Sequence, residues 1–191
     1  MDYKPEIFVE QFPLVKRFLY HLTYFRELSK ASKKCQVQSE LWTHTINAHL
    51  LQATMIWCMV FGSDGCNPTH WKNLSDEDCK ELQSSFRQRL CEVIGLSTDQ
   101  WNEYWLEITS FRNRYVAHRE LNYDEPVPGF TTALEIALFY DRWVREIISP
   151  DILEEPPLDQ FIKALRAAVV PLIEKLFSIT KEYNITTEQF A

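Results

Sequence analysis

Apolar residues recur every three or four positions along most of this chain of 191 residues. That spacing places them on one face of an α-helix, because successive residues of a helix turn by about 100°. In the first half of the chain it predicts helices over residues 14–32, 37–61 and 76–93. No alternation of apolar and polar positions continues beyond four residues, so no strand is expected.

The second half of the chain shows the same spacing in three more segments. One helix is expected over about residues 98–119. The next is expected to open with Thr132 and Glu135, which have the spacing of a capping box, in which side chains of the first turn satisfy free backbone N–H groups. The last helix is expected to begin near Leu158.

Two local signals refine this outline. Ser75 and Asp78 also have the spacing of a capping box, and they are expected to open the helix over residues 76–93. Pro171 lies inside the last helix, where it removes a backbone hydrogen bond at a cost of roughly 3 kcal/mol. It is therefore expected to kink that helix or to divide it in two.

These elements predict an all-α fold, a single-domain antiparallel helical bundle of about six helices over residues 1–191. A chain of this length is sufficient for one domain with its own hydrophobic core. The composition agrees, because 46% hydrophobic and 25% charged residues are ordinary values for a globular protein.

The net charge of −7 argues against a surface that binds nucleic acid or an anionic membrane over its whole extent. It leaves room for a local basic groove. The five cysteines include no CxxC pair, so neither a disulfide framework nor a zinc site is indicated. We expect no metal and no cofactor.

A cytoplasmic location without membrane attachment is expected. The cysteine content suits a reducing compartment. The N-terminus carries acids where a signal peptide has basic residues. The most apolar stretch, residues 50–62, is too short to span a bilayer and is expected to be a buried helix.

Most candidate sites for chemistry fail on spacing or on motif. His44 and His49 are five residues apart, so they do not share a helix face as a metal-binding pair would. His21 lies beside the apolar stripe of the first helix and is expected to be structural, and the tryptophans at helical spacing are expected to be core residues. The segment 61–74 is expected to form a shaped turn anchored by Trp71, and the role of His70 is left open.

The stretch SFRNRYVAHRE, residues 110–120, reverses the acidic charge of the chain. On an ideal α-helix, Arg112 and His118 lie about 120° apart, with Tyr115 midway between them. The midline continues through Phe111 and Ile108. Cations at a helix C-terminus favour the helix dipole, which explains one or two of these residues without any function.

The segment RNRYVAHR resembles the Arg-polar-x-His motif of the HEPN superfamily, helical bundles found among RNA-cleaving toxins and defence proteins. Arg112 matches the motif arginine, Asn113 the polar residue and His118 the histidine. The chain is most similar to the abortive-infection U branch, which has an upstream aromatic region like Trp57 with FGS at 61–63 and HWK at 70–72.

This resemblance implies a metal-independent endoribonuclease, a toxin in a toxin–antitoxin or phage-defence system, whose active site forms across a homodimer. Its partners would be an RNA substrate and an antitoxin protein or RNA. The residues that it implies are Arg112, His118 and Asn113 in catalysis, Arg114 and Arg119 in RNA binding, and Tyr115, Phe111 and Ile108 at the dimer interface.

An alternative is a non-catalytic dimeric module of the same fold, which binds RNA, a nucleotide or a protein. One departure from the family bears on regulation. Some HEPN toxins carry a modified tyrosine two residues after the histidine, whereas this chain has Glu120. Inactivation of the toxin by modification of that tyrosine is therefore not expected.

Overall fold

The computed structural model describes residues 3–37, 39–75, 80–148 and 154–182. Within these ranges the chain forms six α-helices, and the only β-type contact is a single bridge between Tyr3 and Ser75. The predicted all-α fold is confirmed. None of the helices in these ranges has the length and apolar character that crossing a membrane requires.

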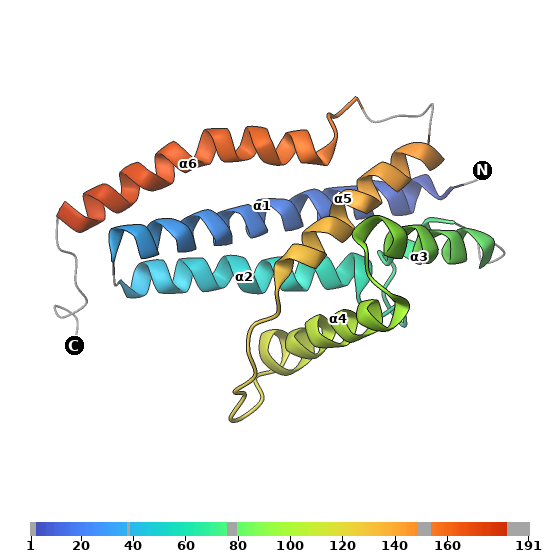
Figure 1. Cartoon of the computed structure of the whole chain (residues 1–191), viewed down its shortest axis with the longest axis horizontal. Helices are drawn as coiled ribbons and strands as arrows, with labels where there is room; N and C mark the ends of the chain where they lie inside the picture. Colours follow the sequence, from blue (N-terminus) through green and yellow to red (C-terminus); the bar gives the residue numbers. More distant parts are fainter. Residues whose placement is uncertain (1–2, 38, 76–79, 149–153, 183–191) are drawn as a thin grey trace.

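The helices follow one another without intervening sheet (Figure 1). A 3₁₀ turn, Trp71–Leu74, follows α2, and a π-helical turn, η2, follows α4 directly. The bounds are α1 Pro5–Cys35, α2 Glu40–Phe61, α3 Lys80–Ile94, α4 Thr98–Phe111, η2 Arg112–Ala117, α5 Phe130–Ile147 and α6 Leu158–Glu182.

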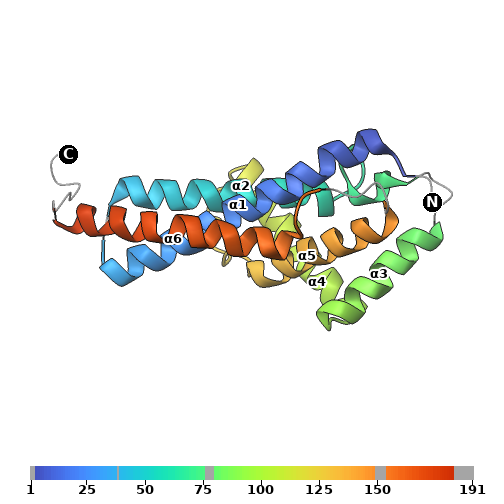
Figure 2. The same ribbon diagram turned by 90° about the horizontal axis from the view of Figure 1, so that it is seen from above.

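The three longest helices, α1, α2 and α6, lie lengthwise beside one another, and α3, α4 and α5 gather toward one end of them (Figures 1 and 2). Gln36 takes a left-handed backbone conformation, with φ of 54°, and ends α1, so that the chain reverses into α2. The two helices are therefore antiparallel, as the bundle prediction requires.

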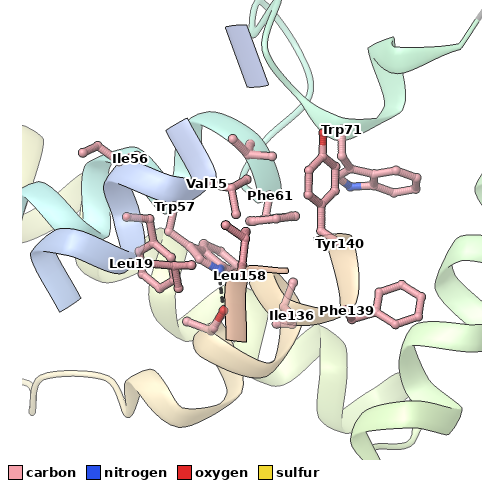
Figure 3. Close-up of a cluster of buried hydrophobic side chains, with 14 of the residues drawn as sticks. Val15, Leu19, Ile56, Trp57, Phe61, Trp71, Ile136, Phe139, Tyr140 and Leu158 are labelled. Atoms are coloured by element: carbon pink, nitrogen blue, oxygen red, sulfur yellow. Dashed lines mark hydrogen bonds between the residues drawn. The ribbon is translucent and has the colours of Figure 1, made fainter. Parts of the chain in front are cut away.

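The main core lies where α5 crosses the first two helices (Figure 3). Trp57 is completely buried, and its indole Nε1 donates a hydrogen bond of 3.3 Å to the carbonyl of Ala133 on α5. Phe61 and Tyr140 meet edge to face in the same cluster, with ring centroids 5.6 Å apart. Buried aromatic rings thus join α2 to α5.

A smaller cluster lies at the other end of the long helices. Leu28 and Ala31 of α1 pack with Ile173 and Phe177 of α6. Trp42 of α2 stacks on Phe177 at 4.5 Å, and its indole N–H donates to the Thr180 hydroxyl at 3.2 Å. All three long helices are therefore held together along their length.

Several predicted helix boundaries were wrong. The first helix begins at Pro5 rather than at residue 14, because a proline at the first helical position costs no hydrogen bond. The fifth begins at Phe130 with Gly129 at its N-cap, so Thr132 and Glu135 do not form its capping box.

The last helix begins at Leu158 as predicted, and its first N–H donates to the buried carboxylate of Asp141 at 2.9 Å. Pro171 is exposed and α6 continues through it, so of the two expected effects, a kink or a division, the division into two helices does not occur. Asp78, which belongs to the capping box predicted for the third helix, lies outside the described residues.

The capping box at the start of α4 is complete. The Ser97 hydroxyl accepts a hydrogen bond from the Gln100 N–H at 3.2 Å, and the Gln100 side chain accepts one from the Ser97 N–H at 2.9 Å. We expect Ser97→Ala to lower the free energy of unfolding by about 1 kcal/mol in urea denaturation. Ser84→Ala, an exposed position inside α3, is the control and should change it by less than about 0.5 kcal/mol. Equal effects of the two substitutions would contradict the cap.

Candidate functional site at the end of α4

The backbone changes its hydrogen-bonding pattern where the motif begins. α4 ends at Phe111, and the six residues RNRYVA, Arg112–Ala117, form a π-helical turn. The N–H of His118 donates to the carbonyl of Asn113, five residues earlier, at 3.2 Å. The prediction of one α-helix over residues 98–119 was therefore wrong in its last turns, and the ideal α-helical angles do not apply there. Within the described ranges this is the only π-helical segment.

Arg112 is half-buried and lies against α2, the helix that packs on the π turn. Its guanidinium contacts the buried thiol of Cys58. Burial raises the pKa of that thiol to about 11, and the nearby Arg112 charge opposes the rise. The Nε atom of Arg112 is buried without a hydrogen-bond partner in the described part of the chain. The motif arginine thus leaves one donor unused.

Arg114 is the most strongly paired cation of the motif. Its guanidinium forms ion pairs with Glu120 and with Glu125, which the loop after the motif brings back toward the π turn. These hydrogen bonds raise the pKa of Arg114, and the bond to Arg114 lowers the pKa of Glu120. Arg114 was predicted to contact RNA, but two carboxylates of the chain itself already offset its charge.

His118, Asn113 and Arg119 are all exposed. His118 takes an extended conformation immediately after the π turn. Its imidazole makes no hydrogen bond or ion pair within the described residues. Arg119 places its guanidinium over the Tyr115 ring, 4.0 Å from the centroid, and forms no ion pair in the described ranges. The exposed part of the motif thus carries a free imidazole, an amide and an uncompensated guanidinium.

The predicted dimer interface requires a correction. Ile108 is 0% and Phe111 1% exposed, so both belong to the core of the chain itself and not to its surface. Phe111 stacks on Tyr115 with centroids 5.2 Å apart, and Tyr123 from the following loop packs on Tyr115 at 5.1 Å. Of the three expected interface residues, only Tyr115 is partly exposed.

The structure therefore separates the motif into two sets of residues. Arg112 points toward α2 and the interior, whereas Asn113, His118 and Arg119 lie at the surface. No hydrogen bond joins Arg112 to His118 in the described structure. Leu121, which the sequence did not single out, is 87% exposed in the loop just after the motif. The sequence alone does not show that this leucine is exposed to solvent beside the cations of the motif.

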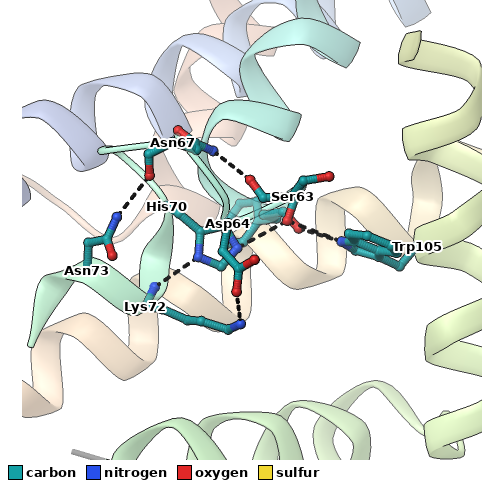
Figure 4. A network of polar contacts seen from close by, with 9 residues as sticks. Ser63, Asp64, Asn67, His70, Lys72, Asn73 and Trp105 are labelled. Carbon is teal, nitrogen blue, oxygen red and sulfur yellow. Dashed lines mark hydrogen bonds and ion pairs between the residues drawn. The ribbon is translucent and has the colours of Figure 1, made fainter. Parts of the chain in front are cut away.

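His70 has a structural role in the turn 61–74 (Figure 4). It is only 2% exposed; its Nε2–H donates to the Gly62 carbonyl at 3.1 Å, and its Nδ1 accepts from the Lys72 N–H at 3.3 Å. Burial lowers its pKa to about 4. Trp71 is buried and stacks on Phe86 at 4.0 Å, which confirms it as an anchor. The imidazole is therefore neutral and fully bonded.

The same turn is tied to α4. The indole Nε1 of Trp105 donates to the Phe61 carbonyl at 2.9 Å. Gly62 is required by close packing, since a Cβ there would lie 2.5 Å from the Cys58 carbonyl oxygen. A cavity of about 1070 Å³ opens between this turn, α3 and α4, and the half-buried rings of Trp101 and Trp105 line it. These two tryptophans pack against the edge of the core and also line the cavity, so the core position expected from their helical spacing is only partly met.

His21 and His49 form a pair between α1 and α2, with their Nδ1 atoms 2.9 Å apart. Only one of these nitrogens can carry the shared proton, which fits a structural role for His21. In the described residues, no three His, Cys, Asp or Glu side chains come together as metal ligands.

The resemblance to the HEPN superfamily depends on the motif residues at the π turn and on the aromatic segment upstream, which forms the end of α2 and the turn after it. Comparison of the chain with protein-family models, with curated proteins and with solved structures finds no match.

Proposed function

We propose that this protein is a metal-independent endoribonuclease of the HEPN type, with His118 at its catalytic centre. The observation that carries the proposal is the unengaged imidazole of His118 directly after the π turn. π-Helical turns are rare and occur often at functional sites. Here the turn coincides with the six residues from Arg112 to Ala117. The coincidence links a backbone irregularity to a cluster of residues suited to phosphate chemistry.

The chemistry requires groups that one chain supplies only in part. Attack by the RNA 2′-OH needs a base at the hydroxyl, an acid at the leaving oxygen and cations at the phosphorane. A histidine can act as either base or acid near neutral pH. One chain provides a single free histidine in the motif, so a second copy of His118 would complete the pair across a two-fold axis. Arg119 would bind the scissile phosphate, and Asn113 would orient it. Arg112 would reach the phosphate only by leaving its contact with the Cys58 thiol.

The proposed dimer contact consists of Tyr115 and Leu121, the partly exposed aromatic and the exposed aliphatic residue beside the motif. We expect Leu121→Asp to weaken the dimer by about a hundred- to ten-thousandfold, because the substitution removes two leucine side chains, one from each protomer, and burial of each contributes roughly 1.5–3 kcal/mol. Light scattering over a dilution series measures this effect. Leu172→Asp, at a 63% exposed position on α6, is the control. A wild-type protein that cleaves RNA as a monomer would refute the shared site.

The biological setting in this proposal is a toxin–antitoxin or phage-defence system in the cytoplasm. Glu120 stands where some related toxins carry a modified tyrosine, and in this chain it is bonded to Arg114. Neutralisation would therefore come from an antitoxin protein or RNA that covers the exposed motif residues. Growth arrest on expression, relieved by a neighbouring gene product, is the corresponding observation in cells.

The direct test of the activity is incubation of the purified protein with structured and unstructured RNAs in excess EDTA. We expect cleavage that chelation does not abolish, with a 2′,3′-cyclic phosphate on one product, because the attacking group belongs to the RNA itself. Cleavage that requires a divalent ion would contradict a metal-independent reaction. RNA binding without any cleavage would contradict the endonuclease.

A non-catalytic dimeric module that binds RNA, a nucleotide or a protein is the second candidate. It is favoured by the two ion pairs of Arg114 and by the contact of Arg112 with Cys58, which give both arginines structural roles. For such a module, replacing His118 would leave ligand binding unchanged. The cleavage assay therefore separates the two candidates.

A further inference from the structure

A second cavity, distant in sequence from the motif, lies between α1, α5 and α6. Its volume is about 210 Å³, roughly seven times the space that a water molecule occupies in the liquid. Each of the three helices contributes aliphatic side chains to one part of its wall: Leu19, Leu22, Leu134 and Ile162. The remaining wall is polar and comes from α1 and α6.

The polar wall holds more cations than anions. Arg26, Glu27 and Arg166 all line the cavity, so two guanidiniums face one carboxylate. Glu27 is bonded to Arg166 through Oε1 and Nε at 2.7 Å. Arg26 forms no hydrogen bond or ion pair in the described structure, although it is half-buried. A partly buried cation without a partner is costly, because it loses hydration without compensation.

Two hydroxyl groups near Arg26 also lack acceptors. Thr23 lines the cavity and is buried, and its hydroxyl makes no hydrogen bond within the described residues. Tyr104 is close enough to Arg26 for each to shift the pKa of the other. Its buried hydroxyl meets the backbone of Ala133 outside hydrogen-bonding geometry and has no other partner in the described ranges. Buried donors usually have a partner, so the Tyr104 hydroxyl behind the wall, together with the unbonded Arg26 and Thr23 side chains that line it, indicates an absent acceptor.

We propose that this cavity binds a small organic anion, a carboxylate on a short branched apolar body. The Arg26 guanidinium would hold the carboxylate by two parallel hydrogen bonds, the geometry for which arginine is best suited. The Thr23 hydroxyl would donate a further bond. The apolar body would lie against the aliphatic wall, and the volume admits about eight non-hydrogen atoms at the density of organic matter. This inference does not depend on the proposed ribonuclease activity.

The test is calorimetric titration of the full chain with 4-methylpentanoate, which has the required charge, branching and size. Two further titrants isolate each part of the proposal: the neutral amide of the same acid, and inorganic phosphate. We expect the carboxylate to bind and the amide to bind at least about tenfold more weakly, since a charged hydrogen bond is lost. Phosphate, which lacks the apolar body, should also bind at least about tenfold more weakly.

Arg26→Gln provides the matched variant. It retains a polar side chain and removes the repulsion from Arg166, so its thermal midpoint should not fall below that of the wild type. We expect it to weaken carboxylate binding by about tenfold or more. Arg142→Gln, at an exposed position on α5, should leave binding unchanged.

Three results would overturn the proposal. The first is that the wild-type chain binds neither anion. The second is that the amide binds as tightly as the carboxylate, which would show that charge is irrelevant. The third is that phosphate binds as tightly as the carboxylate, which would show that the apolar wall is irrelevant. The comparison among titrants uses the wild-type chain alone and so does not depend on the folding of any variant.

Discussion

His118→Ala is expected to reduce RNA cleavage by about a hundred- to ten-thousandfold, the usual contribution of one general acid or base. The loss should appear in the rate constant at saturating RNA, because the imidazole acts on protons and not on substrate binding. The free energy of unfolding of the variant should equal that of the wild type, since the His118 side chain is exposed and unbonded in the described structure. Single-turnover cleavage in EDTA, beside thermal unfolding, measures both quantities.

The matched control is His44→Ala, which also removes an exposed histidine but from α2, outside the motif. It should leave the cleavage rate unchanged. Arg112→Lys is a second probe, because it keeps a cation while removing the guanidinium that contacts the Cys58 thiol. Cleavage by His118→Ala at the wild-type rate would refute the proposed role of the imidazole. A loss of activity shared with His44→Ala would place the effect outside the motif.

Stability is expected to fall by about 3 kcal/mol between pH 7 and pH 4 through His70 alone. The pKa of His70 is about 4 in the folded chain, below its ordinary value of 6.5. Between these two values the unfolded chain binds a proton that the folded chain does not bind. Stability is therefore fully present above about pH 6.5 and is lost as the pH falls toward 4.

Urea unfolding at a series of pH values measures this change, but other groups titrate in the same window. The pKa values of His21 and His49 are also lowered by burial, so they contribute with the same sign. His70→Gln isolates the single residue, because a glutamine amide can donate to the Gly62 carbonyl and accept from the Lys72 N–H without titrating. The free energy of unfolding of the wild type minus that of the variant should decrease by about 3 kcal/mol as the pH falls from 7 to 4. A constant difference would show that His70 is not held neutral by its site.

Much of the helical architecture could be predicted, because apolar spacing reports directly on which face of a helix is buried. The beginnings of helices were harder. Leu158 was placed correctly, but the group that receives its N–H is Asp141, seventeen positions earlier and on another helix. Thr132 and Glu135 satisfied a local pattern that the chain does not use, since Gly129 already ends the preceding loop. Local patterns cannot identify a cap that tertiary packing supplies.

The motif could be located from sequence, but its geometry could not. An apolar stripe on α4 does not reveal whether it faces the core of its own chain or a partner, and Ile108 and Phe111 face the core. The charge of Arg114 is offset partly by Glu125, which approaches only because the loop after the motif folds back. The cavity beside Trp105 likewise depends on the path of the turn 61–74. Each of these features is set by loop conformation, which composition and periodicity do not encode.

The π turn has a consequence for how the motif tolerates insertions and deletions. A π-helical ring closes over one more residue than an α-helical ring, so the chain needs about one extra residue to complete each rotation. The six steps from Arg112 to His118 therefore rotate the chain about as far as five steps of an α-helix would. Loss of one residue from this turn would leave the arginine and the histidine in nearly the same angular relation, on a regular helix. A spacer of variable length can thus preserve one arrangement of side chains, provided that the helix changes its winding to compensate.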